Sequence, residues 1–153
     1  MIIAIDLGNT FGYAIKMHSA VESGWERLTI GSKNHPGKKF ELFENWTREL
    51  NDIDLTEIWY EDVKRHNGLH AARAYCGYVA VLQIYAYRRG LPCSGVGVGT
   101  IKKFWTGNGS ATKQMMIAEA NKQGFDTDND NEADAIALLH YVLANKKPAE
   151  AGV

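Results

Sequence analysis

Residues 2–7 have the sequence IIAIDL, and the turn residues Gly8-Asn9-Thr10 follow directly. A short apolar run that is bounded by turn residues is typical of a buried strand. Asp6 lies at the polar end of this run, so its carboxylate is expected where the strand leaves the core. An acidic side chain in this position is the first indication of a functional site.

Periodicity and turn residues predict the other elements. Further strands are predicted at 11–18, 25–31, 57–61 and 92–98, with Glu22-Ser23-Gly24 as the hairpin turn between the first two. Helices are predicted at 40–50, 68–89, 100–105, 110–123 and 131–145, with Ser110 as an N-cap and Gly90 and Gly124 at two helix ends. This order predicts an α/β fold with a five-stranded mixed sheet flanked by helices.

Length and composition fit one domain over residues 1–145, with a flexible tail at 146–153. No apolar run reaches the ~20 residues that span a bilayer, and we expect no signal peptide. Cys76 and Cys93 lie among apolar neighbours, which predicts buried free thiols in a reducing, cytoplasmic compartment. The net charge of −1 does not indicate a polyanionic partner, but local clusters of charge decide such binding.

Three further polar side chains have contexts that match that of Asp6. Glu61 ends the apolar run EIWYE, and Asn131 and Asp134 lie three apart at the start of the predicted last helix. Strand alternation puts only one of Glu61 and Asp62 on the side of the site, and Glu61 follows the apolar run directly. Two strand ends and a facing helix would converge on a divalent cation, and Mg²⁺ prefers such oxygen ligands. Two cations there would support phosphodiester hydrolysis.

This order of elements, together with these acids, resembles the RuvC family of Holliday junction resolvases, which have the ribonuclease-H-like fold. The motifs that carry the resemblance are IAIDLGNT and GYAI within 3–15, IWYED at 58–62, TIKKFWTGNGSATKQMM at 100–116 and NEADAIALLH at 131–140. The resemblance implies a metal-dependent endonuclease that cuts four-way or other branched DNA junctions by paired symmetric nicks. It further implies a homodimer with two Mg²⁺ ions per active site, which Mn²⁺ would be able to replace. The short chain is similar to phage-type members, which implies the cytoplasm of a bacterial or phage-infected cell.

The resemblance also assigns roles to individual residues. Asp6, Glu61 and Asp134 match the family's catalytic, metal-binding acids, and Asn131 matches the position of a fourth ligand. Lys102 and Lys113, eleven residues apart, match two lysines that contact the DNA backbone, and Lys113 is expected beside the scissile phosphate as a catalytic residue. The other candidate DNA contacts are Lys64, Arg65, Arg73 and Lys103.

Two positions depart from the family pattern. The family often has Asp or His where this chain has Asn131, whose amide oxygen can ligate Mg²⁺ but adds no charge. Asp130 is the alternative ligand, and Asn131 would otherwise serve as an N-cap of the last helix. Lys64-Arg65-His66 occupies the place of an aromatic residue that stacks on a base near the crossover. This implies an altered or loose preference for the cleaved sequence.

Two other functions remain open on the sequence. IAIDLGNT also resembles the phosphate-binding turn of actin-like ATPases and sugar kinases, although 153 residues supply only one of the two domains that such proteins need. A non-catalytic junction-binding protein of the same fold is the other alternative, with Asn131 in its favour. In the homodimer, the predicted 68–89 helix would present an apolar face formed by Ala71, Tyr75, Tyr78, Leu82 and Tyr85.

Overall fold

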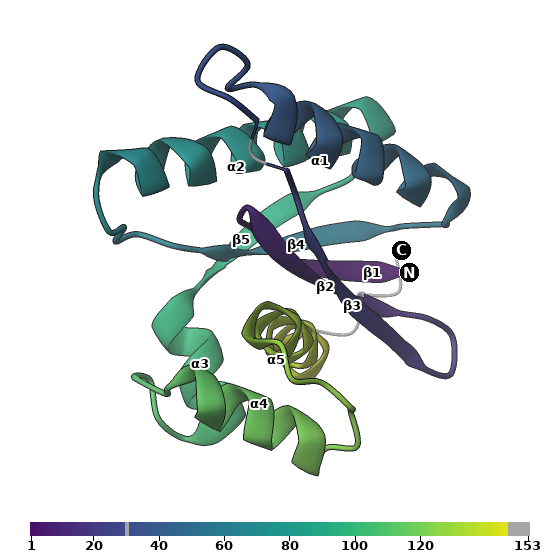
Figure 1. Ribbon diagram of the computed structural model, residues 1–153. Helices are drawn as coiled ribbons and strands as arrows, with labels where there is room; N and C mark the ends of the chain where they lie inside the picture. The colour runs from purple at the N-terminus through teal and green to yellow at the C-terminus, as the bar shows by residue number, and fades with distance from the viewer. Residues whose placement is uncertain (30, 147–153) are drawn as a thin grey trace.

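Five strands form one mixed sheet in the computed structural model, which describes residues 1–29 and 31–146. The strands are β1 (Ile2–Asp6), β2 (Thr10–Lys16), β3 (Val21–Arg27), β4 (Glu57–Asp62) and β5 (Cys93–Gly97). They lie in the order β3-β2-β1-β4-β5 (Figure 1). β2 is antiparallel to both of its neighbours, whereas β1, β4 and β5 run parallel. The predicted α/β fold with a five-stranded mixed sheet is confirmed.

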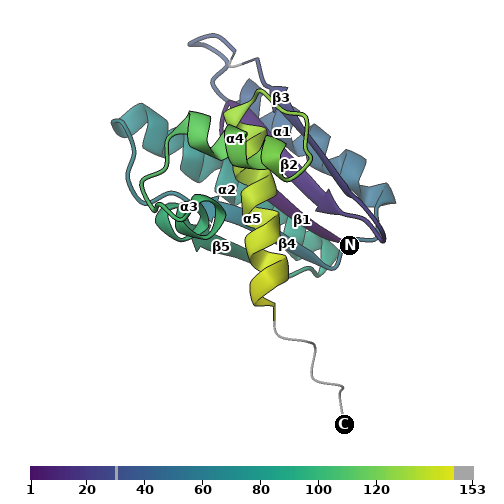
Figure 2. The same cartoon turned by 90° about the horizontal axis from the view of Figure 1, so that it is seen from below.

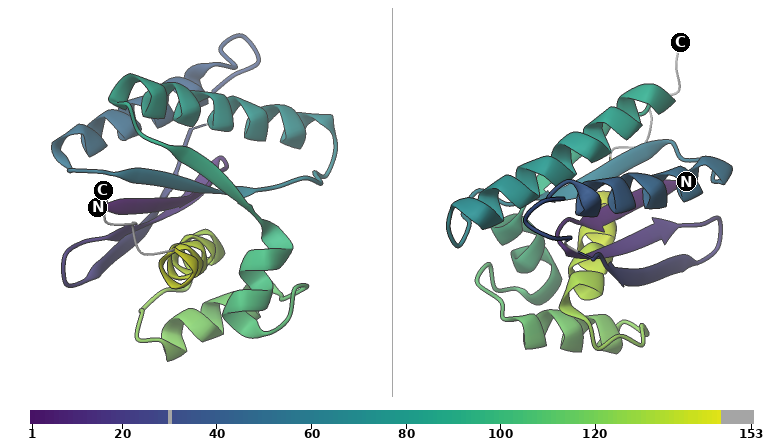
Figure 3. Two further views of the ribbon diagram at one scale, coloured as in Figure 1. Left: turned by 180° about the vertical axis from the view of Figure 1, so that it is seen from behind. Right: turned by 45° about the horizontal axis from the view of Figure 1, so that its top comes forward.

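Helices cover both faces of this sheet. They are α1 (Lys38–Glu49), α2 (Leu69–Arg89), α3 (Val98–Thr106), α4 (Lys113–Lys122) and α5 (Asp130–Asn145), with a 3₁₀ turn at Leu50–Asp52. α1 and α2 lie over one face, and α5 lies across the other, with α3 and α4 on its outer side (Figures 1 and 3). In Figure 2, α5 crosses in front of the strands. α5 is therefore the helix that faces the polar strand ends.

Alternation along β1 divides its side chains between two cores. Ile3, Ile5 and Leu7 pack with the residues of α1 and α2, whereas Ile2 and Ala4 pack with those of α5. Successive side chains of a strand point to opposite faces, so Asp6 falls on the same face as Ala4. The strand that ends in Asp6 therefore directs this carboxylate toward α5.

Gly12 allows α5 to lie directly against the sheet. It pairs with Asp6 across β1 and β2. A Cβ atom on Gly12 would lie 1.9 Å from the backbone oxygen of Asn131, a residue in the first turn of α5. No side chain other than hydrogen fits between these two backbones, so glycine at this position lets the start of α5 approach Asp6.

Several predicted boundaries are wrong. The hairpin turn lies between Lys16 and Val21, where the Met17 amide donates to the Ala20 carbonyl oxygen, and Glu22-Ser23-Gly24 belongs to β3. Thr112, not Ser110, caps α4, because its hydroxyl accepts a hydrogen bond from the Met115 amide. Gly90 ends α2 in the left-handed conformation, as predicted.

Other predictions concern exposure and the chain end. Both cysteines are free, but Cys76 is exposed rather than buried. In the described part of the chain, no helix is long and apolar enough to cross a membrane. The predicted tail at 146–153 lies outside the described residues except for Lys146, and residue 30, within the strand predicted at 25–31, lies outside them too.

The prediction of which α2 residues form an exposed apolar face is also wrong for three of them. Tyr78, Leu82 and Tyr85 are buried in the core shared with α1 and the sheet. Ala71 is exposed as expected, but most exposed apolar side chains of α2 belong to another set. That set consists of Leu69, Arg73, Cys76, Ala80, Ile84 and Tyr87. These lie three or four residues apart and so form one stripe.

Candidate metal centre

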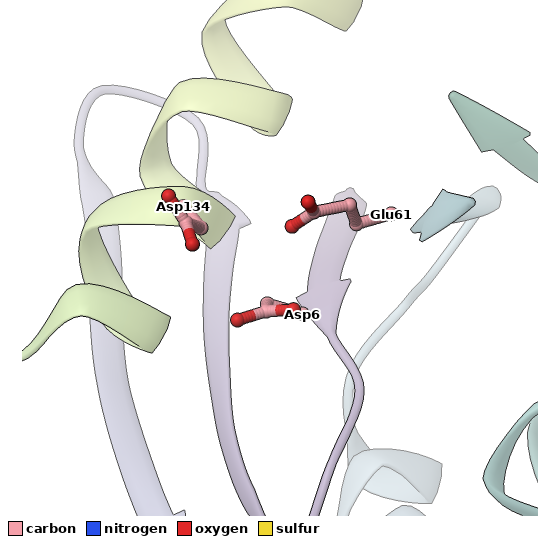
Figure 4. Close-up of side chains that lie close together, drawn as sticks. All are labelled: Asp6, Glu61 and Asp134. Carbon is pink, nitrogen blue, oxygen red and sulfur yellow. The ribbon is translucent and has the colours of Figure 1, made fainter. Parts of the chain in front are cut away.

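Three carboxylates from distant parts of the chain meet at one edge of the sheet. Asp6 ends β1, Glu61 lies near the end of the adjacent parallel strand β4, and Asp134 lies in the first turns of α5 (Figure 4). One oxygen of each lies within 4.8 Å of the others. The register pairs Ile5 with Tyr60, so the next residue of each strand, Asp6 and Glu61, falls on the face covered by α5.

The carboxylates are largely removed from water. Glu61 is only 6% exposed, while Asp6 and Asp134 are partly buried. The Oδ1 atom of Asp134 is buried and has no hydrogen-bond partner within residues 1–29 and 31–146. Buried polar atoms in proteins are nearly always paired, so this oxygen has the properties of a ligand to a cation.

The electrostatics of the three acids lead to the same conclusion. Burial raises the pKa of Asp6 well above its usual value, and the charges of Glu61 and Asp134 raise it further. Burial, followed by the charge of Glu61, raises the pKa of Asp134 to about 8. The pKa of Glu61 is raised by burial as well. Without a cation these groups resist simultaneous ionisation, and a divalent ion with oxygen ligands would remove that penalty.

The first turn of α5 brings two more candidate ligands to the site. The side chain of Asn129 accepts hydrogen bonds from the amides of Asn131 and Glu132, so Asn129 is the N-cap and Asn131 is not. Asp130 forms an ion pair of 2.9 Å with Lys113. Its charge also raises the pKa of Asp6 and of Asp134, which places Asp130 near the three acids.

A basic groove adjoins the carboxylates. It has a volume of about 730 Å³, and its lining includes Glu61 and the basic side chains of Lys64, Arg65, Lys102 and Lys113. The charge of Lys102 lowers the pKa of both Glu61 and Asp134, against the larger effect of burial. Four of the six predicted DNA contacts therefore lie together beside the acids.

The other two predicted DNA contacts, Arg73 and Lys103, are exposed but do not line this groove. Asp62 lies on the opposite face of β4 from Glu61, next to Tyr60 and Gly95. Only one of these two acids therefore lies on the side of the site, as alternation predicts, and it is Glu61, which directly follows the apolar run.

A chain of hydrogen bonds that the sequence did not reveal fixes the start of α5. Glu132 accepts hydrogen bonds from the hydroxyls of Ser23 and Thr127, each at 2.7 Å. Asn121 in α4 donates to the Thr127 carbonyl oxygen and accepts from its amide, each at 3.0 Å. β3, α4 and the segment before α5 thus all hold the turn that carries Asp130 and leads to Asp134. The TDND sequence before NEADA contains suitable polar residues, but nothing in it indicates their partners.

Tyr75 fixes the end of β4 in a similar way. Its hydroxyl donates to the Glu61 carbonyl oxygen at 2.8 Å and accepts from the Val63 amide at 3.1 Å. Burial raises the pKa of Tyr75 to about 12, so the hydroxyl stays protonated. A side chain expected on a dimer face instead supports the backbone of a candidate ligand.

No protein-family model matches the sequence, and no curated protein sequence matches it either. The fold does match solved structures. The RuvC structure from T. thermophilus in complex with a Holliday junction substrate has a TM-score of 0.72, with 16% identity over 90% of this chain and 88% of that chain. A second Thermus thermophilus RuvC structure has a TM-score of 0.66, with 17% identity over 90% and 89% of the two chains.

These matches define the fold class, which is the ribonuclease-H-like α/β fold. Within that class, the chain has the RuvC-type arrangement over nearly its whole length. The resemblance that the sequence motifs indicate is thus confirmed at the level of the fold.

Proposed function

We propose that this chain is a metal-dependent endonuclease that cuts four-way or other branched DNA junctions by paired nicks. The convergence of Asp6, Glu61 and Asp134 within 4.8 Å, on a RuvC-type fold, is the observation that carries the proposal. The adjoining groove supplies lysine and arginine side chains, which are the usual contacts to a DNA backbone. A RuvC of this fold has been solved with a Holliday junction substrate, which supports branched DNA as the substrate class.

Different residues would bind the metal ions and the phosphate in this reaction. Asp6, Glu61 and Asp134, with Asp130 or Asn131, would hold two Mg²⁺ ions, and Mn²⁺ would fit the same oxygen ligands. When bound, these ions would supply activation of an attacking water and stabilisation of the leaving 3′ oxygen. Lys102 and Lys113 neutralise charge on the phosphate, and the low exposure of Glu61 keeps bulk water away from the carboxylates. Lys113 pairs with Asp130, and its ammonium group has three donors, so it can contact a phosphate while it stays beside this carboxylate.

The Asp6→Asn variant tests the assignment of the reaction. It should abolish cleavage of a four-way junction in Mg²⁺ while leaving junction binding intact, because phosphate contacts come from basic side chains. Four-way, flap and linear duplex substrates should be compared, since they separate a junction resolvase from a broader nuclease of branched DNA. Cleavage by Asp6→Asn at the wild-type rate would disprove the assignment.

The fourth ligand can be identified by two alanine variants. Asp130 carries a charge and lies near Asp6 and Asp134, so Asp130→Ala should raise the Mg²⁺ concentration needed for cleavage more than Asn131→Ala does. Asn131→Asp should be tolerated in either case. A larger effect of Asn131→Ala would assign the ligand to the amide instead.

A two-fold substrate is matched most simply by a two-fold protein, and we therefore propose a homodimer. The outer stripe of α2 is the candidate interface, since Leu69, Ile84 and Tyr87 are 61%, 49% and 86% exposed. The small side chains of Cys76 and Ala80 between them would let two helices approach closely. Light scattering at micromolar concentration, without and with junction DNA, should give the mass of two chains. A monomer that nicks one strand would contradict the paired mechanism.

Location and source follow from the same proposal. A DNA junction enzyme with two free cysteines fits the reducing cytoplasm of a bacterial or phage-infected cell.

The two rival functions have less support. A nucleotide-binding domain gives no role to Asp134, and a non-catalytic binder gives no reason to bury three carboxylates together. Thermal shifts with Mg·ATP, and binding without cleavage in Mg²⁺ and Mn²⁺, would identify these two rivals respectively.

A further inference from the structure

Basic side chains that the proposed mechanism does not use gather at the end of β3. Arg27 ends this strand, the connection from β3 to α1 carries Lys33, and Lys38 and Lys39 are the first two residues of α1. Arg27, Lys33 and Lys38 are exposed, and Lys39 is partly exposed over the ring of Phe40. We call Arg27 and residues 31–39 the β3 basic segment.

The topology places the β3 basic segment at the edge of the sheet that holds the carboxylates. β3 is antiparallel to β2, and β2 is antiparallel to β1, so β3 and β1 end at the same edge. The chain leaving β3 is fixed there, because the Leu28 amide donates to the Asn9 carbonyl oxygen at 2.7 Å. Asn9 in turn accepts a hydrogen bond from the Tyr78 hydroxyl at 2.7 Å. Asn9 is three residues beyond Asp6 in the turn after β1.

Arg27 and the basic groove lie on opposite sides of the acids in the strand order β3-β2-β1-β4-β5, because the groove residues follow β4 and β5 and Arg27 ends β3. Residues 31–37 continue from this edge over the face of the sheet that α1 and α2 cover (Figure 1). β3 is two strand spacings from β1, which is roughly 10 Å. Successive phosphates of a strand advance about 3.4 Å along a duplex axis, so this offset corresponds to about three phosphates.

Within the described part of the chain, the basic side chains of this segment lack acidic partners, as do the groove residues Lys64, Arg65 and Lys102. Within residues 1–29 and 31–146, the basic side chains that pair with an acid are Arg48, Arg88, Lys113, Lys122 and Lys146. None of the basic residues of the β3 basic segment is in such a pair in this part of the chain. An uncompensated cluster of this kind, in a protein with a net charge of −1, marks a surface that attracts a polyanion.

We propose that the β3 basic segment is a second phosphate-binding surface, which contacts DNA about three or more phosphates from the cleaved bond, on the side away from the Lys102–Lys113 groove. The inference rests on the proposed nuclease function and extends the DNA footprint to both sides of the metal centre. The segment contacts only the sugar-phosphate backbone of the DNA, so these contacts add affinity and no preference for a DNA sequence. The segment therefore affects binding rather than the chemical step.

The test uses the triple variant Lys33→Gln/Lys38→Gln/Lys39→Gln. Binding to a four-way junction is measured in EDTA, so that the DNA stays intact, over a range of salt concentrations. Each lost phosphate contact reduces the slope of log affinity against log salt by about 0.9. The variant should lose two to three units of slope and bind at least tenfold more weakly at about 0.1 M salt. Its cleavage rate at saturating protein should equal that of the wild type.

A matched control removes three positive charges elsewhere, in Lys16→Gln/Lys122→Gln/Lys146→Gln. Lys16 lies at the opposite edge of the sheet, and the other two lysines are in ion pairs, so the wild-type slope should be retained. A triple variant with the wild-type slope and affinity would overturn the inference and leave the nuclease proposal standing. Equal losses in both variants would overturn it too, because the effect would then be one of net charge. A wild-type protein that binds no junction would refute the proposed function and this inference together.

Discussion

Substituting Gly12 by alanine tests how closely α5 must approach the sheet for the metal centre to form. The new Cβ atom would lie 1.9 Å from the Asn131 oxygen and 2.5 Å from the Glu132 nitrogen. Real Cβ contacts are essentially never shorter than 3.0 Å, so the first turn of α5 must move by about 1.1 Å. Asp134 lies one turn further along and moves with it. A displacement near 1 Å in a catalytic constellation costs roughly 100-fold in rate.

The substitution should also destabilise the fold, because overpacking a filled core typically costs about 1–3 kcal/mol. The assay is junction cleavage against Mg²⁺ concentration, with thermal unfolding measured in parallel. Gly12→Ala should cut about 100-fold more slowly, while its junction binding in EDTA stays normal because no lysine is displaced.

The matched control for Gly12→Ala is Gly24→Ala, another glycine in the sheet. The atoms nearest to the new Cβ atom would belong to the end of the Tyr13 side chain, at 2.6 Å from its hydroxyl oxygen, and this side chain can move away. This variant should keep nearly full activity. If Gly12→Ala cleaved at the wild-type rate with an unchanged Mg²⁺ requirement, the close approach of α5 would not be what assembles the site.

The remaining predictions concern pH and the hydrogen bonds at the start of α5. Burial raises the pKa of Asp134 to about 8, whereas the unfolded chain loses this proton near its ordinary value of 3.8. Between these values the metal-free folded state binds more protons than the unfolded state, so its free energy of unfolding falls as pH rises. The metal-free protein should therefore have a lower Tm at pH 8 than at pH 5.5, and Mg²⁺ should raise the Tm more at pH 8. A metal-free Tm that rises over this range would contradict the assignment. Glu132→Ala, which removes the acceptor for Ser23 and Thr127, should raise the Mg²⁺ requirement for cleavage by roughly tenfold. Glu132→Gln should recover most of the activity, and a Mg²⁺ requirement unchanged in Glu132→Ala would mean that these hydrogen bonds do not position the ligands.

The strands and the acids were predictable because their signals are local. An apolar run ending in Asp6 or Glu61 predicts both a strand and the position of its polar end. Alternation puts only one of Glu61 and Asp62 on the side of the site, and Glu61 is favoured because it follows the apolar run directly. The position of the first hairpin was not predictable in this way. Ser23 and Gly24 have turn-forming side chains, but in the fold Ser23 donates to Glu132, and Gly24 leaves room for Tyr13. Tertiary contacts determine both positions.

The orientation of α2 was missed for a related reason. The helix is apolar on most of its faces, so periodicity does not indicate which stripe is buried. Packing against α1 and the sheet selects the stripe that contains Tyr78 and Leu82. The supporting roles of Gly12 and Glu132 depend on residues more than 100 positions apart in the chain, and no spacing within one segment encodes such contacts.

The position of α5 in the chain has a consequence for biosynthesis. α5 is made after every strand of the sheet, yet it packs on β1, β2, β3 and β4 and carries the third carboxylate. A nascent chain that has reached only residue 129 has Asp6 and Glu61 in adjacent strands but no Asp134, and its apolar sheet face is uncovered. Translation therefore completes the proposed active site only at a late step, and an incomplete product would be inactive and prone to aggregation.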